Sequence, residues 1–451
     1  MELEQKMQEL QERRRQLRTK MNANHDPFVL KLPPEIAAHI LHLSMGEWFT
    51  PFILGAVCRG WRQLTRSTPQ LWSQLVFSPP DPDSMMMETL PHLIIDFLER
   101  SSGSPLSLQV SYRGPPHPLP KGSLSIINAL NQHSGRWHDV SFTLPPVYLR
   151  RLRPTSPPQN LQNISIWDPK EYDDDATTAT FDPLVFSMDA RPGPMKFTVI
   201  FIPLKAVDIS WDRLVHLNVT STSFDSLPEI IRDSPLLETC SLFNITLPVN
   251  VSETIIRHPR LRTFKLVYIS DEAFTKILNS LEFPSLELWR LELVENGFGL
   301  DAAVSFLKRS GSGLKTLDLV NIPASASEDV VPLLQATPHL QCLRVEKSFS
   351  SVTDNILKGM SAAASHPTSQ TSNTTGFLSE LQSLEVFGDD LDAWACIPLI
   401  YRSPHRKLLS LDINMYRGRI RDELLLRELG ELVDQGIKLR ISSRRKLSPT
   451  I

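Results

Sequence analysis

Two glycines and an alanine in the middle of the chain have the spacing of a dinucleotide-binding turn. Gly297, Gly299 and Ala302 follow a strand-like segment, residues 291–294, and open a helical one. Glycines in such a turn let a pyrophosphate approach the backbone amides at the start of the helix. The turn also falls where a repeating chain needs a strand-to-helix connection, and a turn glycine requires no nucleotide. We therefore expect no nucleotide site and no cofactor.

Histidine and cysteine spacing gives no stronger sign of chemistry. His39 and His42 are three residues apart in a predicted helix, but no third metal ligand lies within reach in the sequence. The cysteines form no Cys-x-x-Cys pair, so we expect neither a disulfide framework nor a zinc site; they are Cys58, Cys240, Cys342 and Cys396. The chain also has no Gly-x-Ser-x-Gly elbow and no phosphate-binding Gly-Lys-Ser/Thr loop. We expect no metal, no catalytic residues and no enzyme activity.

Composition and charge are those of a globular protein with protein partners. The 451 residues are 41% hydrophobic, enough for two or three domains. The net charge of -3 exerts no general attraction on nucleic acid. No run approaches the length of a membrane span, and the first residues lack a hydrophobic signal core. We expect a cytoplasmic and/or nuclear protein, with neither nucleic acid nor a membrane as partner.

The chemistry therefore has to be sought in binding surfaces, and the first candidates are short amphipathic helices near the N-terminus. Pro33 and Pro34 suit the first turn of a helix whose apolar stripe comprises Ile36, Ile40, Leu41 and Leu43. After a break at Gly46 and Pro51, the pattern predicts a second helix with the stripe Phe52, Ile53, Ala56, Val57, Trp61 and Leu64. A unit this small buries little apolar surface, so we expect it to share its core with another surface.

These helices resemble the F-box, the motif with which substrate receptors of SCF-type cullin-RING ubiquitin ligases bind a Skp-family adaptor. The matching features are a Leu-Pro-x-Glu-Ile start, an Ile-Leu pair one turn later and a Val-Cys-x-x-Trp segment. The resemblance implies a three-helix-type F-box over residues 28–78, joined through the adaptor to a cullin. It also implies the adaptor-binding residues Leu32, Pro33, Pro34, Glu35, Ile36, Ile40, Leu41, Val57, Cys58 and Trp61. The alternative is an ordinary helical hairpin that caps a larger domain, and the connection between Ser44 and Ala56 is longer and more aromatic than the family's usual one.

One pattern, Leu-x-x-Leu-x-Leu or a close substitute, recurs through most of the remaining chain. Its clearest copies begin at Leu161, Leu214, Leu237, Leu261, Leu288, Leu314, Leu340, Leu381 and Leu408. The last two apolar positions of each copy alternate with polar ones, as in a strand buried on one face, and amphipathic helical segments lie between the copies. The pattern resembles a leucine-rich repeat, as in fungal-type F-box proteins with such a C-terminal array. It predicts an α/β chain with an irregular solenoid of parallel strands and helices over residues 136–440; a generic α/β domain is the alternative.

The segments outside these two regions are interpreted from local pattern. Residues 1–24 predict a heptad helix, either self-associating or solvated, with the seam Leu3, Met7, Leu10, Leu17 and Met21 interrupted by Arg14. Residues 79–135 predict a connector with one strand and one helix. We further expect an acidic loop at residues 171–175, a degenerate repeat near residues 197–200, a disordered insertion at residues 361–376 and a basic tail at residues 441–451.

In each predicted strand, the residue between the last two apolar positions should point away from the core. Stacked copies bring these residues into one column: Ser165, Asn218, Ser241, Lys265, Glu292, Asp318, Arg344, Glu385 and Asp412. Repeat solenoids bind partners on such faces, which makes Lys265, Glu292, Asp318 and Arg344 candidate target-binding residues; a merely solvated face is the alternative. The sequence thus predicts a ligase substrate receptor for an unknown protein target, or else a repeat scaffold that acts without a ligase.

Overall fold

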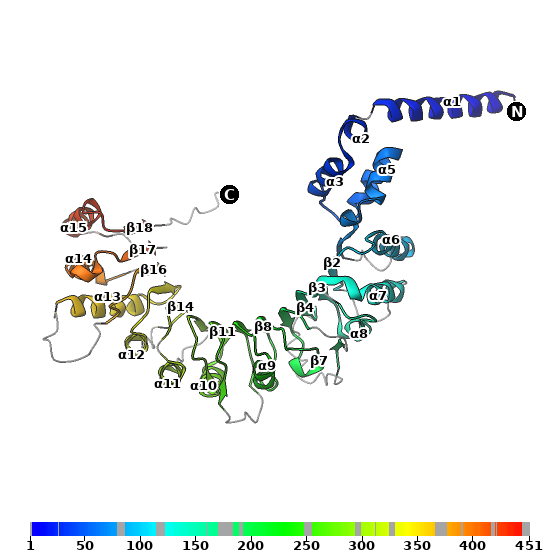
Figure 1. Ribbon diagram of the computed structural model, residues 1–451. Coiled ribbons are helices and arrows are strands. Elements are labelled where there is room, and N and C mark those ends of the chain that lie inside the picture. The colour runs from blue at the N-terminus through cyan, green and yellow to red at the C-terminus, as the bar shows by residue number, and fades with distance from the viewer. Residues whose placement is uncertain are drawn as a thin grey trace. The chain divides into compact units, whose positions relative to one another are not determined.

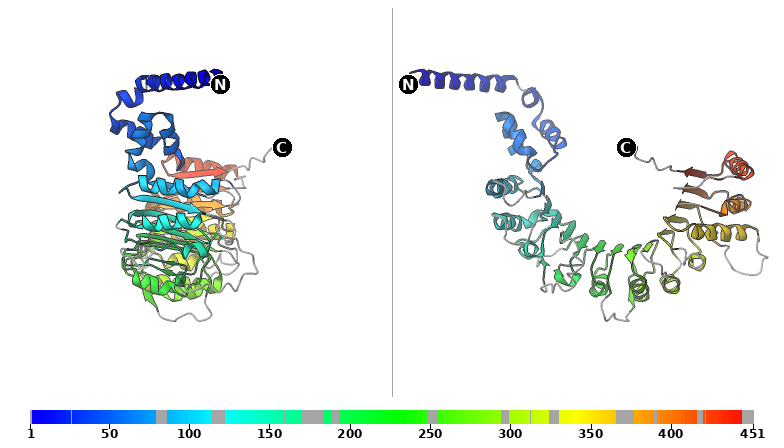
Figure 2. Two further views of the ribbon diagram at one scale, coloured as in Figure 1. Left: turned by 90° about the vertical axis from the view of Figure 1, so that its right-hand side faces the viewer. Right: turned by 180° about the vertical axis from the view of Figure 1, so that it is seen from behind.

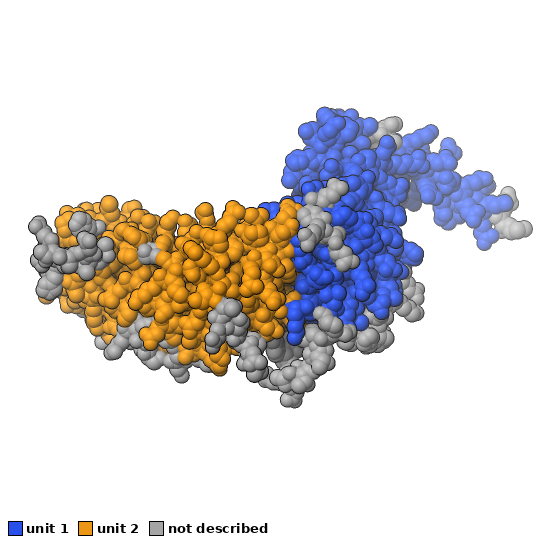
Figure 3. Space-filling model, turned by 60° about the horizontal axis from the view of Figure 1, so that its bottom comes forward, with its two compact units in different colours: residues 1–195, 205–210 blue, residues 196–204, 211–451 orange. Residues whose placement is uncertain are grey.

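The structure is a computed structural model of the 451-residue chain, a mixed α/β protein with two compact units. The first unit comprises Met1–Met195 with Lys205–Ser210, and the second comprises Lys196–Leu204 with Trp211–Ile451 (Figure 3). The described residues are 2–25, 27–78, 86–113, 122–158, 160–169, 184–188, 193–247, 255–293, 299–311, 313–323, 330–365, 377–388, 391–415, 420 and 422–443.

The first unit begins with helices, as the sequence predicts. They are α1 (Glu2–His25), α2 (Pro27–Lys31), α3 (Pro34–Leu43), α4 (Thr50–Val57), α5 (Arg59–Arg66) and the 3-10 turn η1 (Pro69–Trp72). Proline occupies the first turn of α3, α4 and η1, where a missing backbone donor costs nothing. The prediction of one continuous second helix is wrong, because Cys58 has an extended backbone (φ -155°, ψ 177°) that separates α4 from α5.

A parallel sheet follows these helices within the first unit. Its strands, in spatial and chain order, are β1 (Gln74–Phe77), β2 (Leu106–Ser111), β3 (Trp137–Thr143) and β4 (Asn163–Trp167). The other elements of the first unit are α6 (Met86–Arg100), α7 (Ser123–Gln132), η2 (Ser134–Arg136), α8 (Pro146–Leu149) and the strand pair β5 (Phe186–Ser187) and β7 (Val207–Asp208). The stretch expected to be a connector therefore contributes β2 to the sheet, between β1 and β3.

The second unit repeats one strand-and-helix arrangement (Figures 1 and 2). Its parallel strands, in order, are β6 (Lys196–Ile200), β8 (His216–Thr220), β9 (Thr239–Phe243), β11 (Thr263–Ile269), β13 (Leu288–Leu293), β14 (Thr316–Val320), β15 (Cys342–Glu346), β16 (Ser383–Gly388), β17 (Ser410–Met415) and β18 (Leu439–Ser443). A short pair, β10 (Ile256–Arg257) and β12 (Leu281–Glu282), lies apart from this sheet. The turn η3 (Leu204–Ala206) straddles the boundary between the units.

Helices cover one side of the strands of the second unit. They are α9 (Leu227–Asp233), α10 (Asp271–Asn279), α11 (Leu300–Ser310), α12 (Val330–Gln335), α13 (Ser350–Ser365), η5 (Ala393–Ala395), α14 (Cys396–Tyr401), η6 (Pro404–Arg406) and α15 (Glu423–Asp434). Each strand of this sheet from β6 to β17 sends two alternate side chains toward them, such as Leu217 and Val219 in β8, and these are buried. In β18 the corresponding side chains are less covered, since Leu439 is half-buried and Ile441 is exposed. The other face of the strands carries no helix among the described residues of this unit (Figure 1).

Several strands end on a residue with a left-handed backbone, which turns the chain toward its helix. In these turns the backbone N–H donates to a carbonyl of the next strand, as Asn244 does to Val267 and Asn321 to Glu346. The same geometry occurs at Phe201, Ser221 and Lys347. The recurrence of one turn in one register indicates that a single supersecondary unit repeats along the array.

Two expectations at loops and ends change with the structure, and a third is not tested. Helix α13 continues to Ser365, and Ser361 is buried. The prediction of disorder is therefore wrong for residues 361–365. The rest of that insertion, residues 366–376, and the acidic loop at residues 171–175 lie outside the described residues. Strand β18 includes residues 441–443 of the expected basic tail, of which residues 444–451 are not described.

Candidate functional site

The helices from α3 to η1 enclose a small apolar core. Ala37 and Leu41 of α3 face inward, together with Leu64, Leu71 and Trp72. Leu41 is only 2% exposed, so its assignment to the adaptor-binding set is wrong: it stabilises the fold and cannot contact a partner directly. The sequence places it on one stripe with Ile36 and Ile40, because the small inward residue Ala37 gives no sign of which side is buried.

The opposite faces of α3 and α4 carry uncovered apolar side chains. Ile36 is 50% and Leu43 is 72% exposed, and Ile40 lies between them on the same face of α3. On α4, Ile53 and Val57 are similarly exposed and one turn apart. Apolar side chains grouped in this way on a folded surface are typical of a protein-binding site. We call Ile36, Ile40, Leu43, Ile53 and Val57 the outer apolar set.

The remaining predicted adaptor-binding residues surround the helix starts. Pro33, Pro34 and Glu35 are exposed, whereas Leu32, Cys58 and Trp61 are half-buried. The ring of Trp61 lies 4.8 Å, centroid to centroid, from that of Phe28 on α2. The packing is close, since a Cβ at Gly60 would lie 3.1 Å from Val29 Cγ1. The sequence prediction did not include α2; its signal is the apolar run that follows Pro27.

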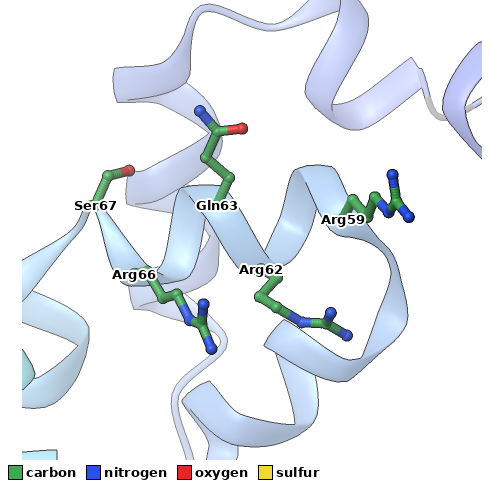
Figure 4. Close-up of a pocket in the computed structure, with 5 residues that line it drawn as sticks. All are labelled: Arg59, Arg62, Gln63, Arg66 and Ser67. Carbon is green, nitrogen blue, oxygen red and sulfur yellow. The ribbon is translucent and has the colours of Figure 1, made fainter.

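A basic hollow lies on α5, and no sequence motif predicts it. Its volume is about 440 Å³, and it is lined by Arg59, Arg62, Gln63, Arg66 and Ser67. Arg62 and Arg66 extend to the same side of α5, and Gln63 points the other way (Figure 4). The Nε of Arg62 donates to the Gly55 carbonyl at 2.8 Å, so this guanidinium also joins α5 to α4. The exposed cations give this surface of α5 a positive charge.

The strand register of the second unit settles which residues share the central column. Lys265 pairs with Arg290, Arg290 with Asp318, and Asp318 with Arg344. The column continues through Glu385, Asp412 and Arg440. We call Lys265, Arg290, Asp318 and Arg344 the central column. The sequence prediction thus placed three of its four residues correctly in register.

Glu292 does not belong to this column, and its prediction as a target-binding residue is wrong. In β13 the inward side chains are Trp289 and Leu291, so Arg290 lies between them. Glu292 is only 7% exposed and accepts hydrogen bonds from Arg290 at 3.2 Å and Asn321 at 3.4 Å. The segment from Leu286 to Leu293 fits the leucine pattern in two registers, one starting at Leu286 and one at Leu288. The sequence prediction used the register that starts at Leu288. The structure has the other, with Trp289 in a leucine position.

The charges of the column are held in place by their neighbours. Arg344 donates to Glu346 at 3.2 Å, and its guanidinium lies 4.9 Å from the ring centroid of Phe387. Burial raises the pKa of Asp318, although the nearby Arg290, Arg344 and Lys265 lower it. The ionised carboxylate is thus less stable here than in water, a condition that often marks a functional position.

The features that could have indicated catalysis have structural explanations or lack partners. A Cβ at Gly299 would lie 2.4 Å from Thr275 Oγ1, so close packing of α11 on α10 accounts for this glycine; Gly297 lies outside the described residues. His39 and His42 are exposed, and the described parts of the chain contain no group of three His, Cys, Asp or Glu side chains that suits a metal. Within those same parts, none of the helices combines the length and the apolar character needed to cross a bilayer.

Comparison with known protein families matches the N-terminal helical segment. The family model described as F-box-like matches residues 29–78, which run from α2 to the end of β1. No curated protein matches the chain. The inward packing around Leu41 and Trp72, and the outer apolar set, therefore lie in a segment with an independent family match. The chain carries an F-box-like domain, formed by residues 29–78.

Proposed function

We propose that the protein is a substrate-receptor subunit of an SCF-type cullin-RING ubiquitin ligase. The single observation that carries this proposal is the outer apolar set, which leaves five apolar side chains uncovered on an F-box-like domain whose other apolar side chains, such as Leu41 and Trp72, are buried. A Skp-family adaptor would cover this set and connect the chain to a cullin. The chain itself would catalyse nothing, and its contribution would be proximity and orientation of a target. We propose that it acts in the cytoplasm, the nucleus or both.

We further propose that the second unit is a leucine-rich-repeat-like array that binds the target. The proposal is supported by the repeated parallel strands, by the recurring left-handed turn and by the helix-free face on which the central column lies. Arg290 replaces Glu292 in the target-binding set, which becomes Lys265, Arg290, Asp318 and Arg344. Fixed charges of both signs favour a protein partner with complementary charges, since such patterns confer specificity.

Co-purification tests the adaptor half of this proposal. The full chain is mixed with a recombinant Skp-family adaptor and separated by size, and a stable complex that also recruits a cullin is the expected result. If no adaptor of this family binds the folded chain, the receptor proposal is wrong. If the adaptor binds but depletion of the protein leaves the turnover of its captured partners unchanged, a scaffold that acts without a ligase is the better description.

Asp318→Asn is expected to weaken target capture without loss of stability. Because burial raises the pKa of Asp318, folding disfavours its ionised form, and removing the charge should leave the free energy of unfolding at neutral pH unchanged or slightly higher. In the parent, this group should make stability rise as the pH falls through its raised pKa, and the variant should lose that rise. Denaturant titration at several pH values and pull-down from cell extract measure the two effects.

Asp412→Asn is the matched control, because Asp412 lies in the same register position three strands further along. It should retain target capture if the central column is the binding surface. Equal target recovery by the parent and Asp318→Asn would move the binding surface away from the central column. A large loss of stability in Asp318→Asn would instead assign this carboxylate a structural role.

A further inference from the structure

The first helix, α1, presents an uncovered apolar seam. All described side chains from Glu4 to Met21 are exposed, including the four apolar ones. Met7 is 56% and Leu10 is 63% exposed, and Leu17 and Met21 are equally uncovered. These four residues and Arg14 follow one another at alternating spacings of three and four, which places them along one side of the helix. No described residue buries this seam, so it is available to a partner.

The width of the seam distinguishes between kinds of partner. A helix that lies in a membrane surface needs a broad apolar face, because a large part of it enters the lipid. On α1 every position outside the seam from Glu4 to Met21 is polar or charged, and Arg14 interrupts the seam itself. A seam this narrow suits another helix, which inserts its own side chains between seam residues in a coiled coil.

The charges beside the seam determine which helix fits. In a coiled coil the residues that flank the seam face the flanking residues of the partner and set partner choice. On α1 these positions are Lys6, Arg13, Lys20, Glu4, Gln11 and Arg18. Four of the six are cationic and one is acidic, and Arg14 adds a cation within the seam. The flanks therefore attract an acidic partner and repel a basic one.

A second copy of the chain is a poor partner by the same rule. In a parallel pair, Arg13 would face Arg18 of the other copy, and Arg14 would meet its own equivalent in the seam. In an antiparallel pair aligned so that the two seams coincide, Arg13 would face Arg13, and Lys6 would face Lys20. The one favourable kind of contact would be between Glu4 and Arg18. Both arrangements place more like charges together than opposite ones, which destabilises pairing.

We propose that α1 forms a coiled coil with a partner helix that has its own apolar heptad seam and acidic residues at the flanking positions. Leu10 and Leu17 are the central apolar contacts, and Arg13 and Arg18 select the acidic flanks. The inference is independent of the adaptor and target surfaces, because it uses only residues 4–21. It adds a third binding surface to the protein, with a partner distinct from both a second copy and a lipid surface.

The test measures binding of the full chain to two synthetic helices of about four heptads with leucine in the seam. One has glutamate at every flanking position and the other has lysine there. The acidic helix should bind at least about tenfold more tightly, and raising the salt from about 0.1 M to about 1 M should reduce the difference. Arg13→Glu combined with Arg18→Glu should reverse the preference. Equal binding of both helices, or of neither, would contradict the proposal.

Three further measurements keep the result specific to the seam. Leu10→Asp combined with Leu17→Asp should abolish binding of the acidic helix, whereas Leu424→Asp, at an exposed apolar position of α15, should not change it. Light scattering should show no dimer of the parent protein that disappears in the variant with Leu10→Asp and Leu17→Asp. Such a dimer would mean that a second copy covers the seam. Sedimentation with phosphatidylserine vesicles should show no seam-dependent binding, since that result would assign it to lipid.

Discussion

Replacing Ile36 with aspartate is expected to abolish capture of a Skp-family adaptor while the protein stays folded. The side chain of Ile36 is half exposed in the free protein, so the substitution removes little from the core. In the complex it would place an unpaired carboxylate in an apolar interface, which costs several kcal/mol and lowers affinity by about 100-fold or more. Calorimetric titration of the purified adaptor into parent and variant measures the difference.

Two further variants define what this result means. Leu424→Asp also introduces a charge at an exposed apolar helix position, but in α15 of the second unit, and it should bind the adaptor as well as the parent. Leu41→Asp should unfold the F-box-like domain, because Leu41 faces its core. If Ile36→Asp binds with parental affinity and melts like the parent, the outer apolar set is not the adaptor surface.

Trp61→Ala is expected to weaken adaptor binding by a different route. Trp61 is half-buried and its ring packs on Phe28, so truncation would also release α2 from α5. The loss of affinity should therefore be accompanied by lower thermal stability, unlike that of Ile36→Asp. Comparison of the two variants separates direct contact with the adaptor from support of the domain.

Much of the fold follows from two sequence periods, and the exceptions have identifiable physical causes. The strands of the second unit could be predicted where two leucines or their substitutes alternate with polar residues, because that pattern fits a strand buried on one face. Strands β1, β3 and β18 lack the full leucine pattern and were not among the predicted copies. They nevertheless pair in parallel with their neighbours, since sheet register depends on hydrogen bonding and on which face is buried more than on residue type.

The candidate sites could be predicted only as far as helix faces and strand register can be read from the sequence. On α3 both faces are apolar, and packing around Ala37 and Leu41 decides which one is inside. On β13 both registers contain leucine, and burial of Trp289 moves Arg290 into the column. Neither choice is encoded locally, because each depends on what neighbouring elements leave room for. The break at Cys58 is of the same kind, since neither proline nor glycine marks it.

Trp72→Ala is expected to cause a large loss of stability in the first unit. The indole is 1% exposed and is enclosed by rings from two segments, at centroid distances of 5.0 Å for Phe52 and 5.6 Å for Phe97. The guanidinium of Arg100 lies 4.9 Å from the ring, and the indole N–H donates to the Thr65 carbonyl at 2.7 Å. Trp72 therefore joins the F-box-like domain to α6, which follows it in the chain.

Truncation of this side chain leaves a cavity and removes the shorter of the two hydrogen bonds that the Thr65 carbonyl accepts, at 2.7 Å from Trp72 and 3.3 Å from the Thr68 backbone N–H. Together these losses should cost about 3–5 kcal/mol. Trp72→Phe keeps an aromatic ring and loses the hydrogen bond, so its cost should be much smaller. Hydrogen exchange in the full chain should show faster exchange in α4 to α6 of the alanine variant and unchanged protection in strands β13 to β17, with adaptor binding lost through unfolding of its site. A loss below about 1 kcal/mol would mean that the contacts of Trp72 do not hold the two segments together.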